Sequence, residues 1–351
     1  MMTKEEFAKE MRDRIHEEMG DGYEVKIQHV TKNNGVELTG LMVNDPTRNV
    51  APTIYLDSMY ENLVEGGMSA DDCAENLARN LKNSMPQAKI NMDFFTDYEQ
   101  VKDKICFRLV NAEANRELLS QVPHEGFKDL AVTFFYPFEH DEIGKGSILI
   151  RNEHAERWGV TEKDLMEAAK VNTPKIFPPR CMPMENVLVQ MISNGPAGEA
   201  ELPERPFQEE AFPMHVLTNG DRTFGAGVMM YDEYLSKVAE AAGCDLYVIP
   251  SSVHELIVLP KDEGMKGEFL RDLVREVNET QVDAQDRLSN SLYAYDRQTQ
   301  TLSLYEGREQ KTSQDQAAQG QATPGEKAAA RTEVLPQEVP DEPSEGPVLS
   351  M

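Results

Sequence analysis

The N-terminal part of the chain carries its hydrophobic residues at a helical spacing. Phe7, Met11 and Ile15 recur every four residues, which places them on one face of a helix. Thr3 and Glu6 have the spacing of a capping box, so the helix is predicted to begin beside Thr3. The pattern therefore predicts an amphipathic helix that packs its apolar face against a core.

An alternating pattern follows the helix. Tyr23, Val25 and Ile27 alternate with charged or polar residues, which is typical of a half-buried strand. Asn34-Gly35 comes next and precedes a second apolar stretch over residues 36–43. Asn-Gly is a preferred pair for a tight turn between antiparallel strands, so the two stretches are predicted to form a hairpin.

Strand and helix patterns continue to residue 305. Strands are predicted over residues 105–110, 128–138, 146–152, 186–192, 214–219, 226–230, 245–250 and 254–260, with a final hairpin over 292–305. Helices are predicted over residues 69–85, 112–122, 231–243 and 267–280, with another beginning at residue 161. Strands mixed with helices in this way predict an α+β fold with mixed or antiparallel sheets and flanking helices.

Composition divides the chain further. Residues 193–213 are rich in Pro, Gly and Glu, so they are predicted to link an N-terminal lobe, residues 1–192, to a C-terminal lobe, residues 214–305. Residues 306–351 contain no aromatic residue and are dense in Gln, Ala, Pro, Glu and Ser. Such a segment cannot bury enough apolar surface to offset the entropy of ordering, so a disordered acidic tail is predicted.

The net charge of the chain limits the classes of partner that it is expected to bind. The chain has 62 acidic and 35 basic residues, for a net charge of −27. Binding to nucleic acid through its phosphates needs a basic face, and the sequence has no basic cluster, so no nucleic-acid partner is expected. The acidic excess fits a solvated surface or a partner with a basic face. DNA mimicry is the least favoured alternative, because the acidic residues are interleaved with lysines and apolar residues.

The cysteines and the N-terminus indicate a cytoplasmic setting. The four cysteines, Cys73, Cys106, Cys181 and Cys244, are scattered and form no CxxC pair. That spacing argues against a zinc ribbon and suits a reducing compartment. The charged N-terminus has no apolar segment typical of a signal peptide, and no apolar run is long enough for a membrane span, so no membrane association is expected.

The stretch "CDLYVIPSSVHELIVLP" collects groups that nucleophilic catalysis uses: Ser251, Ser252, His254 and Glu255. If the second apolar run is a strand, His254 and Glu255 point to opposite faces and cannot both serve one serine. The sequence also has no GxSxG elbow. Three interpretations remain: a structural turn, a ligand or partner site, and a hydrolase-like centre built on Ser251 or Ser252 with His254.

The segment "LTNGD" adds polar groups to these hypotheses. Asn219 and Asp221 are predicted to join His254 and Glu255 at a ligand or partner site, or to assist the hydrolase-like alternative. The glycines of "FGAGVMM" give an incomplete GxGxxG pattern and lead into an apolar run rather than a helix start. A phosphate site needs the backbone N–H groups of a helix start, so no nucleotide or other cofactor is expected.

A short acidic segment, residues 139–142, suggests a metal site. Glu139, His140, Asp141 and Glu142 lie side by side between two predicted strands. Contiguous carboxylates with a histidine could hold a hard divalent ion. Neighbours in sequence rarely all point inward, however, so a solvated acidic loop is the favoured interpretation.

Several blocks of the chain resemble the bacterial domain-of-unknown-function family 5688, found in gut clostridia. The blocks include "KNNGVELTGLMV", "APTIYLDSMYENLVEGG", "DFFTDYEQVKDKICFRLVN", "RELLSQVPHEGFKDLAVTFF", "ILIRNEHAERWGVTEKDLMEAAKVNTPK", "VLTNGDRTFGAGVMMY", "DLYVIPSSVHELIVLP" and "VREVNETQV". They occur in order and cover nearly everything up to about Tyr305. The resemblance implies a cytoplasmic bacterial protein and supplies no activity or catalytic residue.

The function predicted from the sequence is therefore coarse. We expect a non-enzymatic cytoplasmic protein that binds a protein partner or a small ligand, because no strong catalytic signature is present. The alternative is the hydrolase-like enzyme that uses polar residues around Ser251 and His254.

Overall fold

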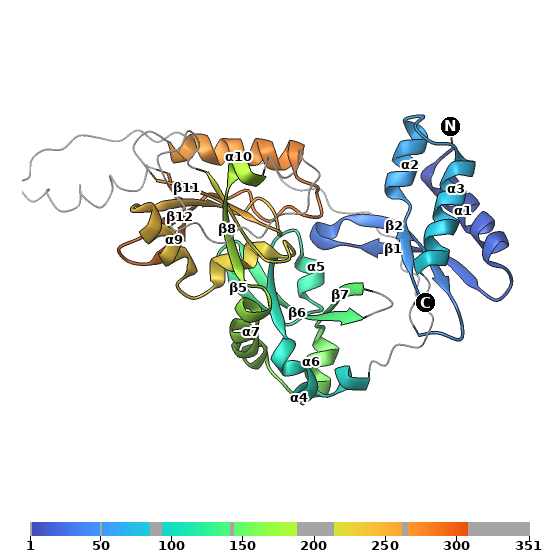
Figure 1. Cartoon of the computed structure of the whole chain (residues 1–351), viewed down its shortest axis with the longest axis horizontal. Coiled ribbons are helices and arrows are strands. Elements are labelled where there is room, and N and C mark those ends of the chain that lie inside the picture. The colour runs from blue at the N-terminus through green and yellow to red at the C-terminus, as the bar shows by residue number, and fades with distance from the viewer. Residues whose placement is uncertain are drawn as a thin grey trace, which may run out of the picture. The chain divides into compact units, whose positions relative to one another are not determined.

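The computed structural model describes residues 2–49, 51–84, 93–140, 144–187, 214–261 and 266–307. The chain divides into two compact units, Met1–Gly307 and Arg308–Met351, and all described residues lie in the first. This unit combines helices with three sheets (Figure 1). Every strand pairing in the described sheets is antiparallel, which confirms the predicted α+β class. The predicted tail lies almost wholly outside the described residues.

Residues 4–84 build a small module, called here the N-terminal module. Its sheet has the strand order β1-β2-β3, and helices α1 and α3 pack against each other beside it (Figure 1). The elements are α1 (Lys4–Met19), β1 (Glu24–Thr31), the 3₁₀ turn η1 (Asn33–Gly35), β2 (Glu37–Asn44), β3 (Thr53–Tyr55), α2 (Asp57–Val64) and α3 (Ala70–Ser84).

The sequence pattern of this module is reproduced in its packing. Phe7, Met11 and Ile15 are fully buried against a core that includes Leu41 and Leu77. The side chain of Thr3 accepts a hydrogen bond from the backbone N–H at the third helical position, and the reciprocal bond completes the predicted capping box. The burial of one helix face therefore holds α1 on its sheet.

A second sheet follows along the chain. Strand β6 pairs with β4, β5 and β7, and helix α7 packs against β4. The elements are η2 (Asp93–Thr96), α4 (Tyr98–Val101), η3 (Lys102–Lys104), β4 (Cys106–Asn111), α5 (Arg116–Leu119), β5 (His124–Phe127), β6 (Leu130–His140), β7 (Gly144–Leu149), α6 (Asn152–Trp158) and α7 (Glu162–Ile176).

The third sheet has six strands in the order β13-β12-β10-β11-β9-β8. Helix α10 packs on one of its faces through Leu270 and Val274, and α9 packs on the other through Val238. The elements are β8 (Pro179–Pro183), β9 (His215–Asn219), η4 (Gly225–Met230), α9 (Tyr234–Ala242), β10 (Leu246–Ile249), β11 (Leu256–Pro260), α10 (Gly267–Gln281), β12 (Tyr293–Asp296) and β13 (Thr301–Leu304).

Two predicted elements differ from the structure. Residues 226–230, predicted as a strand, lie in the 3₁₀ helix η4, because a short apolar run buried all round has no periodicity that separates strand from helix. The helix predicted over residues 112–122 is reduced to the single turn α5. The strand predicted over 186–192 falls mostly outside the described residues.

The hydrophobic cores divide the described chain at a different place from the predicted linker. One cluster of buried residues extends from Val101 to Tyr295, and the core of the N-terminal module ends at Leu81. Strands β8 and β9, on either side of residues 193–213, pair over five residues in one sheet. The change from one core to the next therefore lies between Leu81 and Val101, and the predicted linker itself is outside the described residues.

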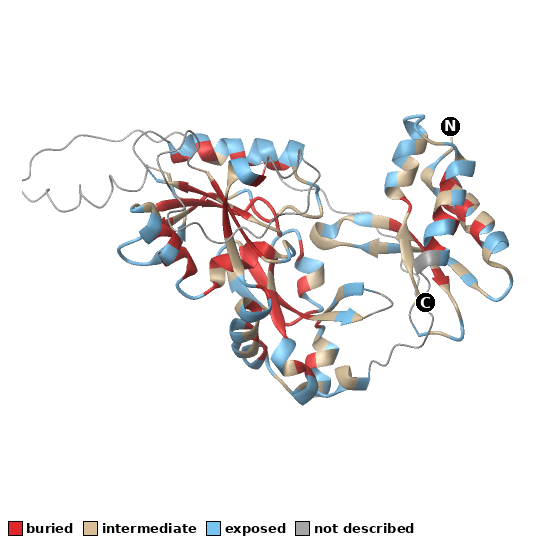
Figure 2. Ribbon diagram, in the orientation of Figure 1, coloured by how far each residue is buried: buried red, intermediate tan, exposed pale blue. Residues whose placement is uncertain are grey.

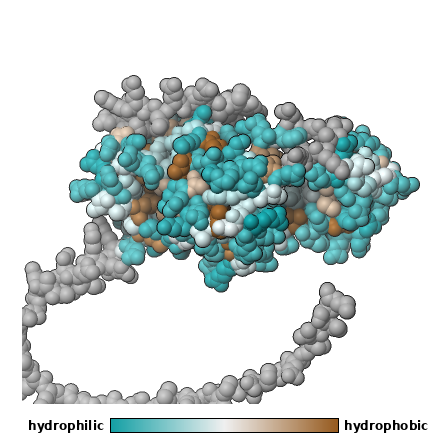
Figure 3. Space-filling view, turned by 90° about the horizontal axis from the view of Figure 1, so that it is seen from below, coloured by the Kyte–Doolittle hydropathy of each residue, from teal (hydrophilic) through white to brown (hydrophobic). Residues whose placement is uncertain are grey.

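Burial follows the sheets and the helix faces that cover them (Figure 2). On the face shown in Figure 3, hydrophilic side chains predominate and hydrophobic ones occur between them, which agrees with the acidic composition. Across the part of the chain that the structure describes, no helix has the length and hydrophobicity needed to cross a membrane.

None of the four cysteines forms a disulfide. Cys73, Cys106 and Cys181 are buried, whereas Cys244 is partly exposed. Burial raises the pKa of Cys106 and of Cys181 to about 12, and it also raises the pKa of Cys73. Since the thiolate is the reactive form, the three buried thiols are expected to be inert in the folded protein.

The two cores lead to a first prediction. Leu41 and Leu217 are both fully buried, one in each core, so replacement of either by Ala should cost about 2–5 kcal/mol of unfolding free energy. In Leu41→Ala, hydrogen exchange should accelerate mainly within residues 4–84. In Leu217→Ala, it should accelerate mainly beyond residue 93. Acceleration of the same peptides in both variants would contradict the division into two cores.

The cysteines lead to a second prediction. With a disulfide-exchange reagent at pH 8, about one thiol per chain should react quickly, and three should react only after denaturation. The Cys244→Ser variant should lose the fast phase and keep the slow one. A second fast thiol in the folded wild-type protein would show that the core around Cys73, Cys106 or Cys181 opens.

Candidate functional site

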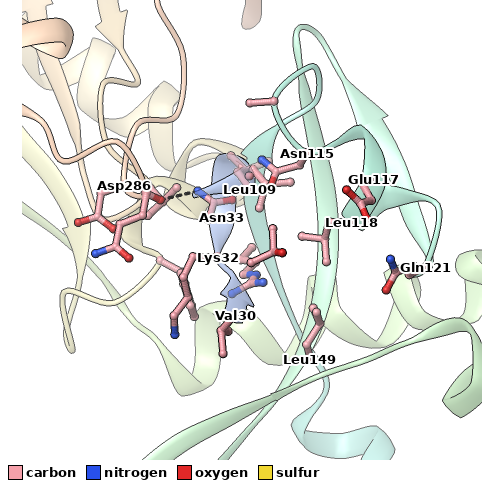
Figure 4. A pocket seen from close by; sticks show the side chains of 18 of the residues that line it. Val30, Lys32, Asn33, Leu109, Asn115, Glu117, Leu118, Gln121, Leu149 and Asp286 are labelled. Carbon is pink, nitrogen blue, oxygen red and sulfur yellow. Dashed lines mark hydrogen bonds between the residues drawn. The ribbon is translucent and has the colours of Figure 1, made fainter. Parts of the chain in front are cut away.

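A cavity of about 670 Å³ lies where the N-terminal module meets the second sheet (Figure 4). Its volume is within the range of pockets that hold small organic molecules. The wall combines the turn of the β1–β2 hairpin, β4, α5 and the loops that carry Phe224, His254 and Asp286. Its apolar lining is Val30, Leu109, Val110, Ala114, Leu118, Leu149, Phe224 and Val253.

An asparagine pair docks the hairpin turn that forms one wall. The backbone N–H of Asn34 donates to Oδ1 of Asn115 at 2.9 Å, and Nδ2 of Asn115 donates back to Oδ1 of Asn34 at 2.9 Å. Nδ2 of Asn34 also donates to the carbonyl oxygens of Ala284 and Arg287, at 2.8 and 2.6 Å. Asn34 has a φ of 62°, a left-handed conformation that asparagine tolerates better than most residues.

The neighbouring residue strengthens the same contact. Nδ2 of Asn33 donates to the carbonyl oxygen of Gln285 at 2.7 Å. In Figure 4 the turn that carries Lys32 and Asn33 passes between the segment of Asp286 and the elements that carry Leu109 and Leu118. The hairpin predicted from Asn34-Gly35 therefore forms one wall of the cavity as well as reversing the chain.

Strand alternation brings one charged residue of β4 to the cavity. Phe107 and Leu109 face the large core. Cys106 and Val110 lie on the opposite face of the strand and belong to two separate apolar clusters. Arg108 lies between these two residues on the same face, so it occupies a gap between the clusters.

The contacts of Arg108 leave its charge largely uncompensated. Its Nε donates to Oγ1 of Thr133, the residue paired with it on β6, at 3.4 Å. Its guanidinium carbon lies 4.7 Å from the centre of the Phe224 ring. Arg108 forms no ion pair among the described residues, and burial lowers its pKa to about 10. A charge that is partly withdrawn from water is normally paired, so this arrangement is unusual.

Two further cationic side chains line the cavity. Nζ of Lys32 lies 4.1 Å from the centre of the Tyr55 ring, and Nη1 of Arg151 donates to Oε1 of Gln121 at 3.0 Å. Neither forms an ion pair within the described ranges. The hollow between α1 and α3 differs in this respect, because its Arg14 and Lys82 pair with Asp71 and Glu18.

The Phe224 loop depends on a close backbone approach. Phe224 has a φ of 53°, which is strained for a bulky residue, and it precedes Gly225. A Cβ at Gly225 would lie 2.1 Å from Oγ1 of Thr218 and 2.3 Å from the carbonyl oxygen of His254. These two oxygens are themselves hydrogen-bonded at 2.7 Å. The glycine therefore lets the loop bring the Phe224 ring over Arg108.

His254 is the predicted site residue that lines the cavity. Its ring is nearly parallel to that of Phe224, with an interplanar angle of 13°. Nδ1 accepts a long hydrogen bond, 3.4 Å, from the backbone N–H of Phe224, and Nε2 lies 3.5 Å from Oδ1 of Asp286. Both ring nitrogens thus face groups other than the predicted serines.

The serines and Glu255 have different surroundings. Ser251 and Ser252 are buried and are not part of the cavity lining. Oγ of Ser252 accepts from the backbone N–H of His254 at 3.0 Å, and the carbonyl of Ser251 accepts from Leu288. Strand β11 begins only at Leu256, so His254 and Glu255 precede the strand on which they were expected to alternate. These contacts are those of a structural turn.

The "LTNGD" loop is also internally bonded. Nδ2 of Asn219 donates to the carbonyl of Thr223 at 2.8 Å, and Asn219 is buried. Asp221 lies 3.4 Å from Nζ of Lys145 on the surface. Neither residue belongs to the cavity lining. Asn219 shapes the loop that leads to Phe224 and so acts on the cavity indirectly.

The structure describes only part of the acidic segment, residues 139–142. Glu139 and His140 end β6, where Glu139 is exposed and His140 is partly buried. Asp141 and Glu142 lie outside the described residues. Within the ranges that the structure describes, no three His, Cys, Asp or Glu residues are grouped so as to hold a metal ion.

Of the residues that line the cavity, only His254 was predicted from the sequence, and the important ones that were missed include Arg108, Phe224 and Asp286. Arg108 had a usable signal, because it is the one charged residue inside the apolar run "ICFRLV". Phe224 and Asp286 had none, since their proximity to Arg108 or His254 depends on how the sheets pack. Loop residues of this kind are found only when the fold is known.

Comparison with known proteins gives a family but no activity. The model of a family of unknown function (DUF5688) matches residues 4–297, which confirms the resemblance seen in the sequence blocks. No curated protein and no solved structure matches the chain. The site must therefore be interpreted from its own geometry.

The close approach at Gly225 leads to a third prediction. Gly225→Ala should lower the unfolding free energy by about 2 kcal/mol, because the new Cβ overlaps Thr218 and the His254 carbonyl. Gly220→Ala is the matched control, since a Cβ there would meet Pro178 at an ordinary 3.7 Å; its effect should stay within about 0.5 kcal/mol. Urea denaturation of both variants measures the difference. Equal effects would mean that the loop can relax.

Proposed function

We propose that the protein, which belongs to the family of unknown function DUF5688, is a binding protein that holds a small organic ligand in the cavity beside Arg108. The single observation that carries the proposal is the uncompensated, partly buried guanidinium of Arg108 on the wall of a cavity of about 670 Å³. A protein retains such a charge at a cost in stability, which is understandable if a ligand compensates it.

The rest of the lining supports a binding role. Val30 of the N-terminal module meets apolar side chains of β4, α5 and β7 there, and a few polar groups converge among them. This mixture is typical of small-molecule sites, where apolar contacts give affinity and polar groups fix orientation. The setting that we propose is the bacterial cytoplasm, as the family resemblance implies.

The contacts of His254 favour binding over the hydrolase-like alternative. A nucleophilic serine needs a base within hydrogen-bond reach of its hydroxyl. The ring nitrogens of His254 face Phe224 and Asp286, and Ser252 Oγ is engaged by the His254 backbone. In the proposal, His254 therefore holds the Phe224 loop and lines the cavity.

The fourth prediction tests this proposal by blocking the cavity. A library of anionic, neutral and cationic fragments is screened by saturation-transfer NMR. Leu118→Trp should fill the cavity and abolish the specific signals, because Leu118 lines it. Leu273→Trp, the same change at a partly exposed position on α10, should preserve them. If no fragment distinguishes wild type from Leu118→Trp, the cavity is not a ligand site and the proposal is wrong.

A further inference from the structure

The charge of the cavity lining is opposite to that of the chain. The whole sequence has 62 acidic and 35 basic residues. The lining has the fixed cations Lys32, Arg108 and Arg151 and the carboxylates Glu117 and Asp286, which gives three positive against two negative groups. None of the three cations has an ion-pair partner among the described residues, so the protein does not neutralise their charge in place.

We propose that the cavity recognises an anionic group, a carboxylate or a phosphate, on a small organic molecule, and that Arg108 binds this group directly. The inference rests on the proposed function and adds the chemical class of the ligand to it. Lys32 contributes a second positive charge on the hairpin side of the cavity.

The geometry of Arg108 suits an oxyanion. Its Nε already makes a long hydrogen bond, 3.4 Å, to Oγ1 of Thr133 on β6. Neither terminal nitrogen has an acceptor in the protein, within the described residues, so both remain to donate to a ligand. A planar guanidinium donates two parallel hydrogen bonds to a carboxylate or phosphate, and such charge-assisted bonds are stronger than neutral ones.

The apolar part of the lining indicates that the anionic ligand is an organic molecule. Val30, Leu118 and Leu149 offer no hydrogen bonds and are best covered by a hydrocarbon or aromatic body. The Phe224 ring, held beside Arg108 by the left-handed turn, adds an aromatic face to this lining. An inorganic ion would satisfy Arg108 and leave these surfaces uncovered.

Arg108 also makes the ligand-free protein less stable than it could be. The guanidinium is partly withdrawn from water and has no carboxylate partner among the described residues, so Arg108→Met, which keeps the packing volume, should raise the melting temperature by roughly 2 °C or more. Arg275→Met removes the same charge from the exposed face of α10 and should have little effect. A purely structural role for Arg108 would give the opposite sign, because its loss would release Phe224 and Thr133.

Binding is measured with three compounds of nearly one shape: benzoate, benzamide and benzamidine, which are anionic, neutral and cationic at neutral pH. Phenyl phosphate is added so that carboxylate and phosphate recognition are distinguished. We expect benzoate or phenyl phosphate to bind wild type and Arg275→Met, and to bind Arg108→Met at least about tenfold more weakly. Arg108→Lys keeps the positive charge but loses the planar guanidinium that donates two parallel hydrogen bonds. This variant should therefore bind more weakly while preserving the preference for anions.

The outcomes separate this inference from the proposed function. If Leu118→Trp abolishes binding but benzamide or benzamidine binds as well as the anions, the cavity is a ligand site and the anionic class is wrong. The anionic class is also wrong if Arg108→Met binds the anions as tightly as wild type does. A third contradicting result would be a lower melting temperature for Arg108→Met together with an Arg108→Lys variant that shows no preference for anions. If no compound in this set or in the fragment library gives a signal sensitive to Leu118→Trp, both proposals are overturned.

Discussion

The hydrogen bonds between Asn34 and Asn115 are the constraint on which the cavity depends. Asn115 is buried, and it also donates to the carbonyl of Asn111 at the end of β4, so the bond reaches from the hairpin turn to the second sheet. The same turn contacts the segment around Ala284. That segment is tied to the second sheet by Asp129, which accepts hydrogen bonds from Ser289 and Tyr293. The three sheets are therefore connected through the segment around Ala284, and the wall of the cavity is formed by this connection.

The cavity shows a conflict between stability and recognition. A hydrophobic residue at position 108 would join the apolar clusters above and below it on β4, and the sheet face would then be continuous. The arginine interrupts that face with a partly buried charge, for which the Phe224 ring and a single long hydrogen bond to Thr133 are weak compensation. A binding site is a common reason for a protein to retain such a feature.

The sequence allowed more of the fold than of the site to be predicted. The helical stripe of Phe7, Met11 and Ile15 and the alternation along β1 are local patterns, and they survive in the structure because each element buries mainly one face. The strand predicted over residues 226–230 was wrong, because a segment that is buried on all sides has no hydrophobic periodicity that separates a strand from a helix. His254 was found from its chemistry, but its neighbours were not, since Phe224 and Asp286 approach it only through the packing of loops distant in sequence.

The pairing of β8 with β9 has a consequence for how the chain can be divided. Pro183 pairs with His215, so the described chain leaves one edge of the six-stranded sheet and returns to the adjacent position. A cut between these strands would leave both new ends held by the same sheet, and it would divide the large core, which extends from Val101 to Tyr295, between the two fragments. Fragments produced by proteolysis there should therefore remain associated under native conditions, and they should not be taken as the boundaries of independently folding domains.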